Sequence, residues 1–258
     1  MIKKFTLLFL PILAGCVSHL PISLSDTNKP RTSIYQLKTH SVKLPTVIVS
    51  HGSSGVNDHL LSVADKIHGW GFNTVVIDHY SQKGISAGLH NVGTTVKGAT
   101  GSERALDAIA VARWIKVQPW HSGQIVLVGY SQGGATVNAL ASKEKILTSY
   151  KGMVNSSDYD IFAGAVGVYP SCGYLLDANP PLVTSPFPVQ LHIASEDDLA
   201  RPEWCRTSAK NYDLIYYEGA THGFDFVAQN TKFTHRYNPK VTSLSLNKMR
   251  EFITSRLR

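Results

Sequence analysis

Residues 125–134 read IVLVGYSQGG, and this stretch decides the fold of the chain. Its first five residues are apolar and mostly β-branched up to the glycine, as in a buried strand of a parallel sheet. The pattern G-x-S-x-G follows at Gly129, Ser131 and Gly133, and the residues after it have the composition of a helix. A strand, a sharp turn and a helix in this order are typical of a nucleophile elbow, which lifts the serine hydroxyl above the sheet. The sequence therefore predicts that Ser131 is a nucleophile.

The rest of the chain alternates strands with helices in the same way. This alternation predicts an α/β fold, with a mostly parallel central sheet of about seven strands and helices on both faces. Residues 81–101 interrupt the rhythm, and we expect either a wall of the active site or an irregular surface loop there. The expected strands are residues 33–38, 46–50, 74–78, 125–129, 163–169, 189–194 and 214–218, and the expected helices are 57–70, 102–117, 132–143, 203–212 and 243–258.

A serine nucleophile needs a general base, usually a histidine that a carboxylate orients. His222 follows the last expected strand, in the turn GATHGF. His51 and His79 also follow strands, but both precede Ser131 in the chain. The α/β-hydrolase fold carries its triad in the order Ser, acid, His, which favours His222.

The acid of the triad is expected after the strand that lies between the serine and the histidine. That strand ends in Ser-Glu-Asp-Asp, where Asp197 is the first choice and Asp198 the second. Two backbone amides should bind the oxyanion: that of Gln132, directly after the nucleophile, and that of Ser53 in the glycine-rich loop HGSSG. All these positions follow strand ends, where open α/β sheets bind their ligands.

Composition and charge exclude several classes of protein. The chain has 258 residues, of which 43% are hydrophobic and 17% charged, as is usual for a folded domain rather than a disordered chain. The net charge of +7 is spread along the chain, so we expect no nucleic-acid partner. The motifs HExxH, the Walker loop and the Rossmann fingerprint are absent, and we expect no metal and no organic cofactor.

The N-terminus resembles the signal of a bacterial lipoprotein. A short basic start is followed by an apolar run at residues 5–13, which is too short for a spanning helix of roughly 20 residues. The sequence LAGC then ends at Cys16 and is similar to a lipobox. The resemblance implies cleavage before Cys16 and acylation of that residue, which would anchor the protein to the membrane.

Val17 after the cysteine implies, through the same resemblance, an outer-membrane protein that faces the periplasm. No later segment is apolar enough to span a bilayer. The expected organisation is a signal peptide at residues 1–15, a lipid-anchored tether at 16–30 and an α/β-hydrolase domain at 31–258.

Taken together, these motifs resemble the dienelactone hydrolase-like family of α/β hydrolases. The similar stretches are VIVSHGSSG, ERALDAIAVARWIKVQPW, IVLVGYSQGG, GAVGVYPSCG, LHIASEDDLARPEWC and YYEGATHGFDF. The founding enzymes of the family use a cysteine nucleophile where this chain has Ser131, so the resemblance implies the fold and hydrolase chemistry but not lactone specificity. The leading hypothesis is a serine hydrolase that acts on small carboxylic esters or lactones. Counting back from Cys205 places the family's acid on Asp197, whereas counting back from Pro202 places it on Asp198.

Cys172 and Cys205 form an even pair in a chain that we expect to be exported, which predicts a disulfide. The YPSCG and DDLARPEWC blocks also resemble family members with paired cysteines. Three alternatives to an esterase remain: a peptidase of the same fold, a thioesterase of the same fold, and a catalytically inactive surface protein that binds a ligand.

Overall fold

The structure is a computed structural model that describes residues 20–23, 31–91, 96–172, 184–206, 210–227 and 235–258. Eight strands form one sheet in the order β1-β2-β4-β3-β5-β6-β7-β8. β1 and β2 are antiparallel to their neighbours, and all other pairs are parallel. This confirms the predicted α/β fold. The strands are β1 (Leu20–Ser23), β2 (Arg31–Lys38), β3 (Leu44–Ser50), β4 (Asn73–Asp78), β5 (His121–Tyr130), β6 (Phe162–Val168), β7 (Val189–Ala194) and β8 (Tyr212–Tyr217).

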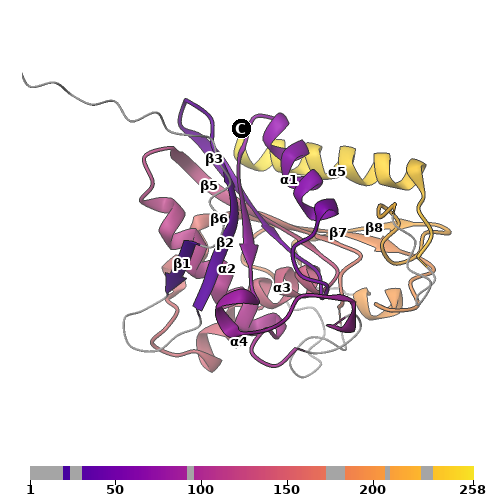
Figure 1. The fold of residues 1–258 in the computed structure, drawn as a ribbon, viewed down its shortest axis with the longest axis horizontal. Coiled ribbons are helices and arrows are strands. Elements are labelled where there is room, and N and C mark those ends of the chain that lie inside the picture. The colour runs from indigo at the N-terminus through magenta and orange to yellow at the C-terminus, as the bar shows by residue number, and fades with distance from the viewer. Residues whose placement is uncertain (1–19, 24–30, 92–95, 173–183, 207–209, 228–234) are drawn as a thin grey trace, which may run out of the picture.

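Helices cover both faces of this sheet (Figure 1). α1 and α5 lie on one face, and α2, α3 and α4 lie on the other. Short 3₁₀ helices occupy several of the connections. The helices are α1 (Asp58–Gly69), α2 (Gly101–Lys116), α3 (Gln132–Ala141), α4 (Lys143–Ser149) and α5 (Pro239–Leu257), and the 3₁₀ helices are η1 (Ser81–Lys83), η2 (Leu89–Asn91), η3 (Ser156–Ile161) and η4 (Pro202–Cys205).

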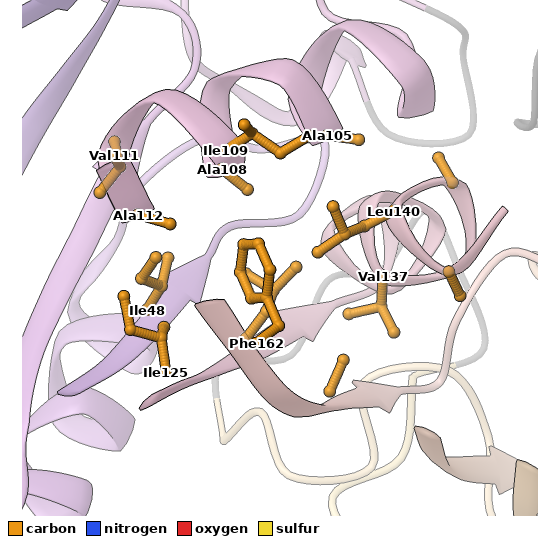
Figure 2. Packing of buried hydrophobic residues seen from close by; sticks show 14 of the residues in the cluster. Ile48, Ala105, Ala108, Ile109, Val111, Ala112, Ile125, Val137, Leu140 and Phe162 are labelled. Atoms are coloured by element: carbon orange, nitrogen blue, oxygen red, sulfur yellow. The ribbon is translucent and has the colours of Figure 1, made fainter. Parts of the chain in front are cut away.

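The two covered faces explain why the central strands are apolar without interruption. In β3, Ile48 packs into the cluster beneath α2 and α3, whereas Val47 and Val49 pack into the cluster beneath α1 and α5. Figure 2 shows the first of these clusters, in which Ile109 of α2 and Leu140 of α3 point towards the sheet. Successive side chains of a strand point to opposite faces, so both sets must be hydrophobic.

One predicted helix, at residues 203–212, is wrong. Among the described residues of this range, which omit 207–209, the only helix is the 3₁₀ helix η4, and the chain has entered β8 by Tyr212. Cys205 is tied by a disulfide, and Asn211 has a positive φ of 71°, which ends any helix before the strand.

Three other boundaries also differ from the prediction. The helix predicted at 132–143 is broken at Ser142, whose hydroxyl donates to the carbonyl of Asn138. α5 begins earlier than predicted because Asn238 caps it and Pro239 occupies its first turn. β1 lies within the segment that we predicted to be a tether, and it pairs with β2.

Candidate active site

Ser131 lies between the end of β5 and the start of α3, as the elbow motif predicts. Its backbone has φ 54° and ψ −114°, a conformation that non-glycine residues rarely adopt. The Ser131 amide donates to the carbonyl of Val168 on β6 (2.9 Å), and the Ser131 carbonyl accepts from the amide of Gly134 (2.8 Å). These bonds hold the turn in place, with the hydroxyl directed away from the sheet.

The glycines of the motif are required by close backbone contacts. A Cβ at Gly129 would overlap the carbonyl of Gly133, and a Cβ at Gly133 would overlap the carbonyl of Ser50 on β3. Both obstacles are backbone atoms, which cannot rotate out of the way as a side chain can. Only glycine at these positions allows α3 to begin so close to the sheet.

The structure brings Ser131, His222 and Asp197 into one chain of hydrogen bonds. The Ser131 hydroxyl lies 2.8 Å from Nε2 of His222, and Nδ1 of His222 lies 2.7 Å from Oδ2 of Asp197. A carboxylate only accepts, so Nδ1 carries the proton and Nε2 is left to accept from the serine. This geometry is that of a nucleophile, a general base and an orienting acid.

Asp197 is held in place from behind by the turn after β7. Its Oδ1 accepts from the backbone amides of Leu199 (3.0 Å) and Ala200 (2.7 Å), so the carboxylate is fixed and buried. Asp198 is exposed. Of the two predicted acids, Asp197 is therefore the one that contacts the histidine.

His79, one of the competing histidines, has a serine and an aspartate of its own. Its Nε2 lies 2.9 Å from the Ser50 hydroxyl, and its Nδ1 lies 2.7 Å from Oδ2 of Asp107. All three side chains are fully buried beneath the sheet edge, so a substrate cannot reach this second set. Burial also lowers the pKa of His79 well below its ordinary value.

The two predicted oxyanion donors belong to Gln132, which directly follows the nucleophile, and to Ser53 in the loop after β3. Within the described part of the chain, the amides of Ser53 and Gln132 donate to no other group. The loop that carries Ser53 passes close to the nucleophile, because a Cβ built on Gly52 would lie 3.3 Å from the Cβ of Ser131. An oxyanion site requires two backbone amides that are free to donate near the nucleophile, and these two amides are the candidates.

A cavity of about 310 Å³ opens at this edge of the sheet. Ser131 and His222 lie at its wall together with the Ser53 loop. Gly88, from the irregular segment 81–101, also lines the cavity, so part of that segment is a wall of the site, which is the first of the two alternatives that the sequence left open. The remaining walls are mostly aromatic, with Tyr130, Tyr169, Phe226, His59 and His235.

Sequence reasoning missed a buried polar group behind these aromatic walls. Tyr169 follows β6 with a positive φ of 37°, its ring lies 4.8 Å from the His222 ring, and its hydroxyl donates to Oδ1 of Asp225 (2.9 Å). The other oxygen of Asp225 lies 3.3 Å from Nε2 of His59. Asp225 comes three residues after His222, and that proximity in the chain was the only signal available.

The predicted disulfide between Cys172 and Cys205 is confirmed, with a Cα–Cα distance of 5.0 Å. It joins the segment after β6 to η4 after β7, next to the loop of Asp197. No helix among the described residues is long and apolar enough to cross a bilayer. The described residues also contain no group of three or more His, Cys, Asp or Glu arranged to hold a metal ion. Cys16 lies outside them.

The sheet order, the elbow and the serine–histidine–aspartate arrangement at its edge define an α/β hydrolase. A family model for the dienelactone hydrolase family matches residues 32–257. The chain belongs to this family.

Comparison with solved structures agrees in fold. A dienelactone hydrolase-like promiscuous phosphotriesterase from metagenomic libraries superposes with a TM-score of 0.69 at 17% identity, covering 95% of this chain and 100% of that one. Est1E from Butyrivibrio proteoclasticus superposes with a TM-score of 0.59 at 18% identity, covering 93% of this chain and 98% of that one. Esterase 2 from Thermogutta terrifontis superposes with a TM-score of 0.62 at 16% identity, covering 95% of this chain and 97% of that one. The comparison with curated proteins finds no match.

Proposed function

We propose that the protein is a serine hydrolase that cleaves uncharged carboxylic esters or lactones through an acyl-enzyme on Ser131. The observation that carries this proposal is the unbroken chain from the Ser131 hydroxyl through His222 to the buried Asp197, at the wall of an open cavity. The backbone amides of Ser53 and Gln132, which donate to no other described group, support a place for negative charge near the nucleophile.

The mechanism follows from the positions of these groups. His222 takes the proton of Ser131 through Nε2 while the serine oxygen attacks the substrate carbonyl, and the amides of Ser53 and Gln132 bind the oxyanion. The imidazolium then protonates the leaving alcohol, and Asp197 stabilises the positive charge. Water, deprotonated by His222, attacks the acyl-enzyme and releases the acid, which restores the serine.

The walls of the cavity favour an uncharged substrate with an apolar or aromatic acyl group. No Lys, Arg, Asp or Glu is among the described lining residues, and Tyr130, Tyr169 and Phe226 present rings. A formal charge placed there would lose its hydration without an opposite charge to compensate it. One solved structure of Est1E holds ferulic acid, an aromatic acid, in a protein of the same fold.

The test uses p-nitrophenyl acetate and butyrate with the wild type and the Ser131→Ala variant. We expect turnover by the wild type and background hydrolysis by the variant, a fall of at least about 10³-fold. A fluorophosphonate probe should label the wild type and leave Ser131→Ala unlabelled. Folded wild type that neither turns over esters nor takes the probe would instead indicate a binding protein.

We also propose that the protein is exported and anchored to the cell envelope through acylated Cys16, facing the periplasm from the outer membrane. The basic start, the apolar run and LAGC support this. Expression in a two-membrane bacterium with radiolabelled palmitate should label the wild type in the membrane fraction. The variant Cys16→Ser should be unlabelled, and equal labelling of the two would contradict the proposal.

A further inference from the structure

Three consecutive carbonyl groups of the oxyanion loop are each bound by a buried side chain. Arg104 of α2 donates from Nη2 to the carbonyl of His51. Nδ1 of His51 lies 2.6 Å from the carbonyl of Gly52, and the Tyr80 hydroxyl donates to the carbonyl of Ser53 (3.0 Å). Arg104, His51 and Tyr80 are all within 1% of complete burial. The loop is therefore tied to the protein interior through its carbonyl oxygens.

The contacts of His51 select one tautomer of its ring. Nε2 accepts from the backbone amide of His79 (3.1 Å), so this nitrogen carries no proton. Burial, with the charge of Arg104 as a second cause, holds the pKa of His51 well below its ordinary value, so the ring is neutral. The single ring proton is then on Nδ1 and is donated to Gly52. The Nδ1 contact with Nη2 of Arg104 (3.2 Å) then pairs two donors and is not a hydrogen bond.

These bonds determine where the Ser53 amide points. In a trans peptide the carbonyl and the following N–H point in opposite directions. The Gly52 carbonyl is turned towards the His51 ring, so the Ser53 N–H of the same peptide is turned away from it. Gly52 itself lies against Ser131, and Ser53 lines the cavity with Ser131.

Tyr80 connects the two donor residues to each other. Its hydroxyl lies 3.0 Å from the carbonyl oxygen of Ser53 and 3.0 Å from Oε1 of Gln132, and its single proton is shared between these two acceptors. The backbone amide of Gln132 is the other expected oxyanion donor. The Gln132 side chain is held at its other end by the carbonyl of Ala99 (3.3 Å). The buried Tyr80 hydroxyl thus contacts both residues whose amides are expected to bind the oxyanion.

We propose that His51 and Tyr80 are positioning residues that fix the two oxyanion amides, with Arg104 behind them as the support of the loop. The inference rests on the proposed function and deepens it. Neither residue is among the described residues that line the cavity. Each acts by keeping an amide at the place where negative charge develops, and such preorganisation matters most in the transition state.

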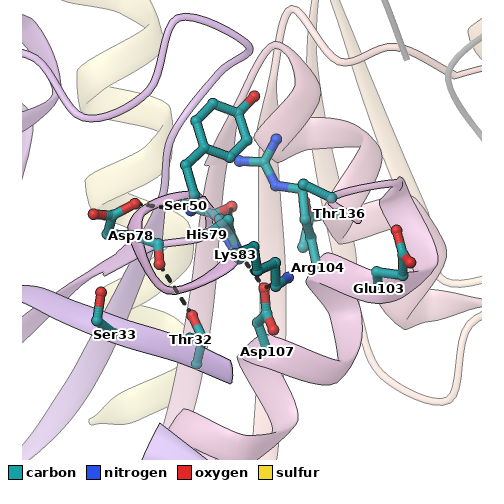
Figure 3. Close-up of polar contacts among 12 residues, drawn as sticks. Thr32, Ser33, Ser50, Asp78, His79, Lys83, Glu103, Arg104, Asp107 and Thr136 are labelled. Atoms are coloured by element: carbon teal, nitrogen blue, oxygen red, sulfur yellow. Dashed lines mark hydrogen bonds and ion pairs between the residues drawn. The ribbon is translucent and has the colours of Figure 1, made fainter. Parts of the chain in front are cut away.

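Arg104 belongs to a larger buried cluster with Asp107, Lys83 and His79 (Figure 3). Lys83 and His79 both contact Oδ2 of Asp107 at 2.7 Å. Burial lowers the pKa of Arg104 only to about 10, so its guanidinium is charged at neutral pH. That positive charge lies beneath the oxyanion loop, and its sign is the one that stabilises an oxyanion.

The decisive variant is Tyr80→Phe, which removes the hydroxyl and keeps the ring. We expect kcat for p-nitrophenyl butyrate to fall about tenfold with KM within twofold of wild type, because the lost contact matters in the transition state. A trifluoromethyl ketone, which adds to the serine and forms an oxyanion, should bind about tenfold more weakly. The matching methyl ketone, which binds without addition, should bind equally well.

Tyr217→Phe is the matched control, because it also removes a buried hydroxyl, one that lies 3.0 Å from Nδ1 of His192 and away from the loop. It should change stability and leave kcat and both ketone affinities unchanged. His51→Asn keeps a donor near the position of Nδ1 and should retain more kcat than His51→Leu, which has none.

The outcomes separate this proposal from the proposed function. If the wild type neither hydrolyses the ester nor binds the trifluoromethyl ketone, the proposed function fails. If the wild type does both, and folded Tyr80→Phe matches it in kcat and in trifluoromethyl ketone affinity, Tyr80 has only a structural role and the present proposal is overturned. If His51→Asn and His51→Leu have equal kcat, His51 is not a positioning residue for the oxyanion amides.

Discussion

Ser131 has a backbone conformation that costs of order 1–3 kcal/mol, and its neighbours maintain it. The amide and carbonyl of Ser131 are both hydrogen-bonded, to β6 and to the first turn of α3. The strain has a use, because it aims the hydroxyl at Nε2 of His222 rather than along the sheet. At the scale of residues, function depends on the position of the Ser131 hydroxyl, which is fixed by the backbone hydrogen bonds of the same residue.

Asp197 can be separated from its neighbour Asp198 by mutation. We expect Asp197→Asn to lower kcat by about 10⁴-fold, because the amide cannot hold the productive tautomer of His222. Asp198→Asn is the matched control, since that side chain is exposed, and should keep kcat within a few fold. The measurement is ester hydrolysis by both variants, and a larger loss at Asp198 would reverse the assignment.

The elbow brings strand, turn and helix so close together that glycine is needed. Gly133→Ala should lower the free energy of unfolding by about 3 kcal/mol or more, because its Cβ would overlap the backbone of β3. Gly69→Ala, at the end of α1 with nothing within 4 Å, should be neutral or stabilise by about 0.5–1 kcal/mol. Urea unfolding measures both, and equal effects would refute the steric argument.

At the scale of elements, the carboxyl ends of β5, β7 and β8 carry the nucleophile, the acid and the base. The parallel register places these ends at one edge of the sheet, so Ser131 meets His222, 91 positions further along the chain. The Cys172–Cys205 bond adds a covalent tie between the segments after β6 and β7. Asp197 lies within the stretch of chain that this disulfide closes into a loop.

Removing that bond should destabilise the protein without altering its strands. The two cysteines are 33 residues apart, and closing a loop of this length stabilises by about 3–4 kcal/mol in the chain-entropy model. We expect the double variant Cys172→Ala/Cys205→Ala to lose this amount, with a Tm about 10 °C lower. The reduced wild type should behave in the same way, and the double variant should not respond to reductant.

At the scale of the whole molecule, several histidines are buried as neutral rings, among them His192 in β7. Burial lowers the pKa of His192 to about 3, against an ordinary value of 6.5. The unfolded chain therefore binds a proton that the folded protein does not. The stabilising contribution is complete above about pH 6.5 and is lost as the pH falls towards 3.

We expect His192→Asn to flatten the pH dependence of stability. Between about pH 4 and 6 the free energy of unfolding of the wild type should include a slope of about 1.4 kcal/mol per pH unit from this residue, and the variant should lack it. Ser245→Ala is the control, because it removes a partner of His192 (2.8 Å) and leaves the ring to titrate. An unchanged slope in His192→Asn would contradict the assignment.

The sequence by itself determined strands β2 to β8 and the elbow, because these depend on local patterns, and the order of the triad along the chain selected His222. Apolar runs identify strands covered on both faces, and G-x-S-x-G after such a run identifies the tight turn. The same local interpretation failed at residues 203–212, because η4 ends at Cys205 and Asn211 takes a left-handed backbone conformation directly before β8.

Only the tertiary structure decided between Asp197 and Asp198, and only it revealed the layer of Arg104, His51 and Tyr80 behind the oxyanion loop. Neighbours in sequence point in different directions in a turn, so which carboxylate meets the histidine depends on the path of the chain after β7. The supporting layer joins residues of three segments whose proximity no periodicity encodes, since it arises when α2 packs beneath the carboxyl ends of β3 and β4.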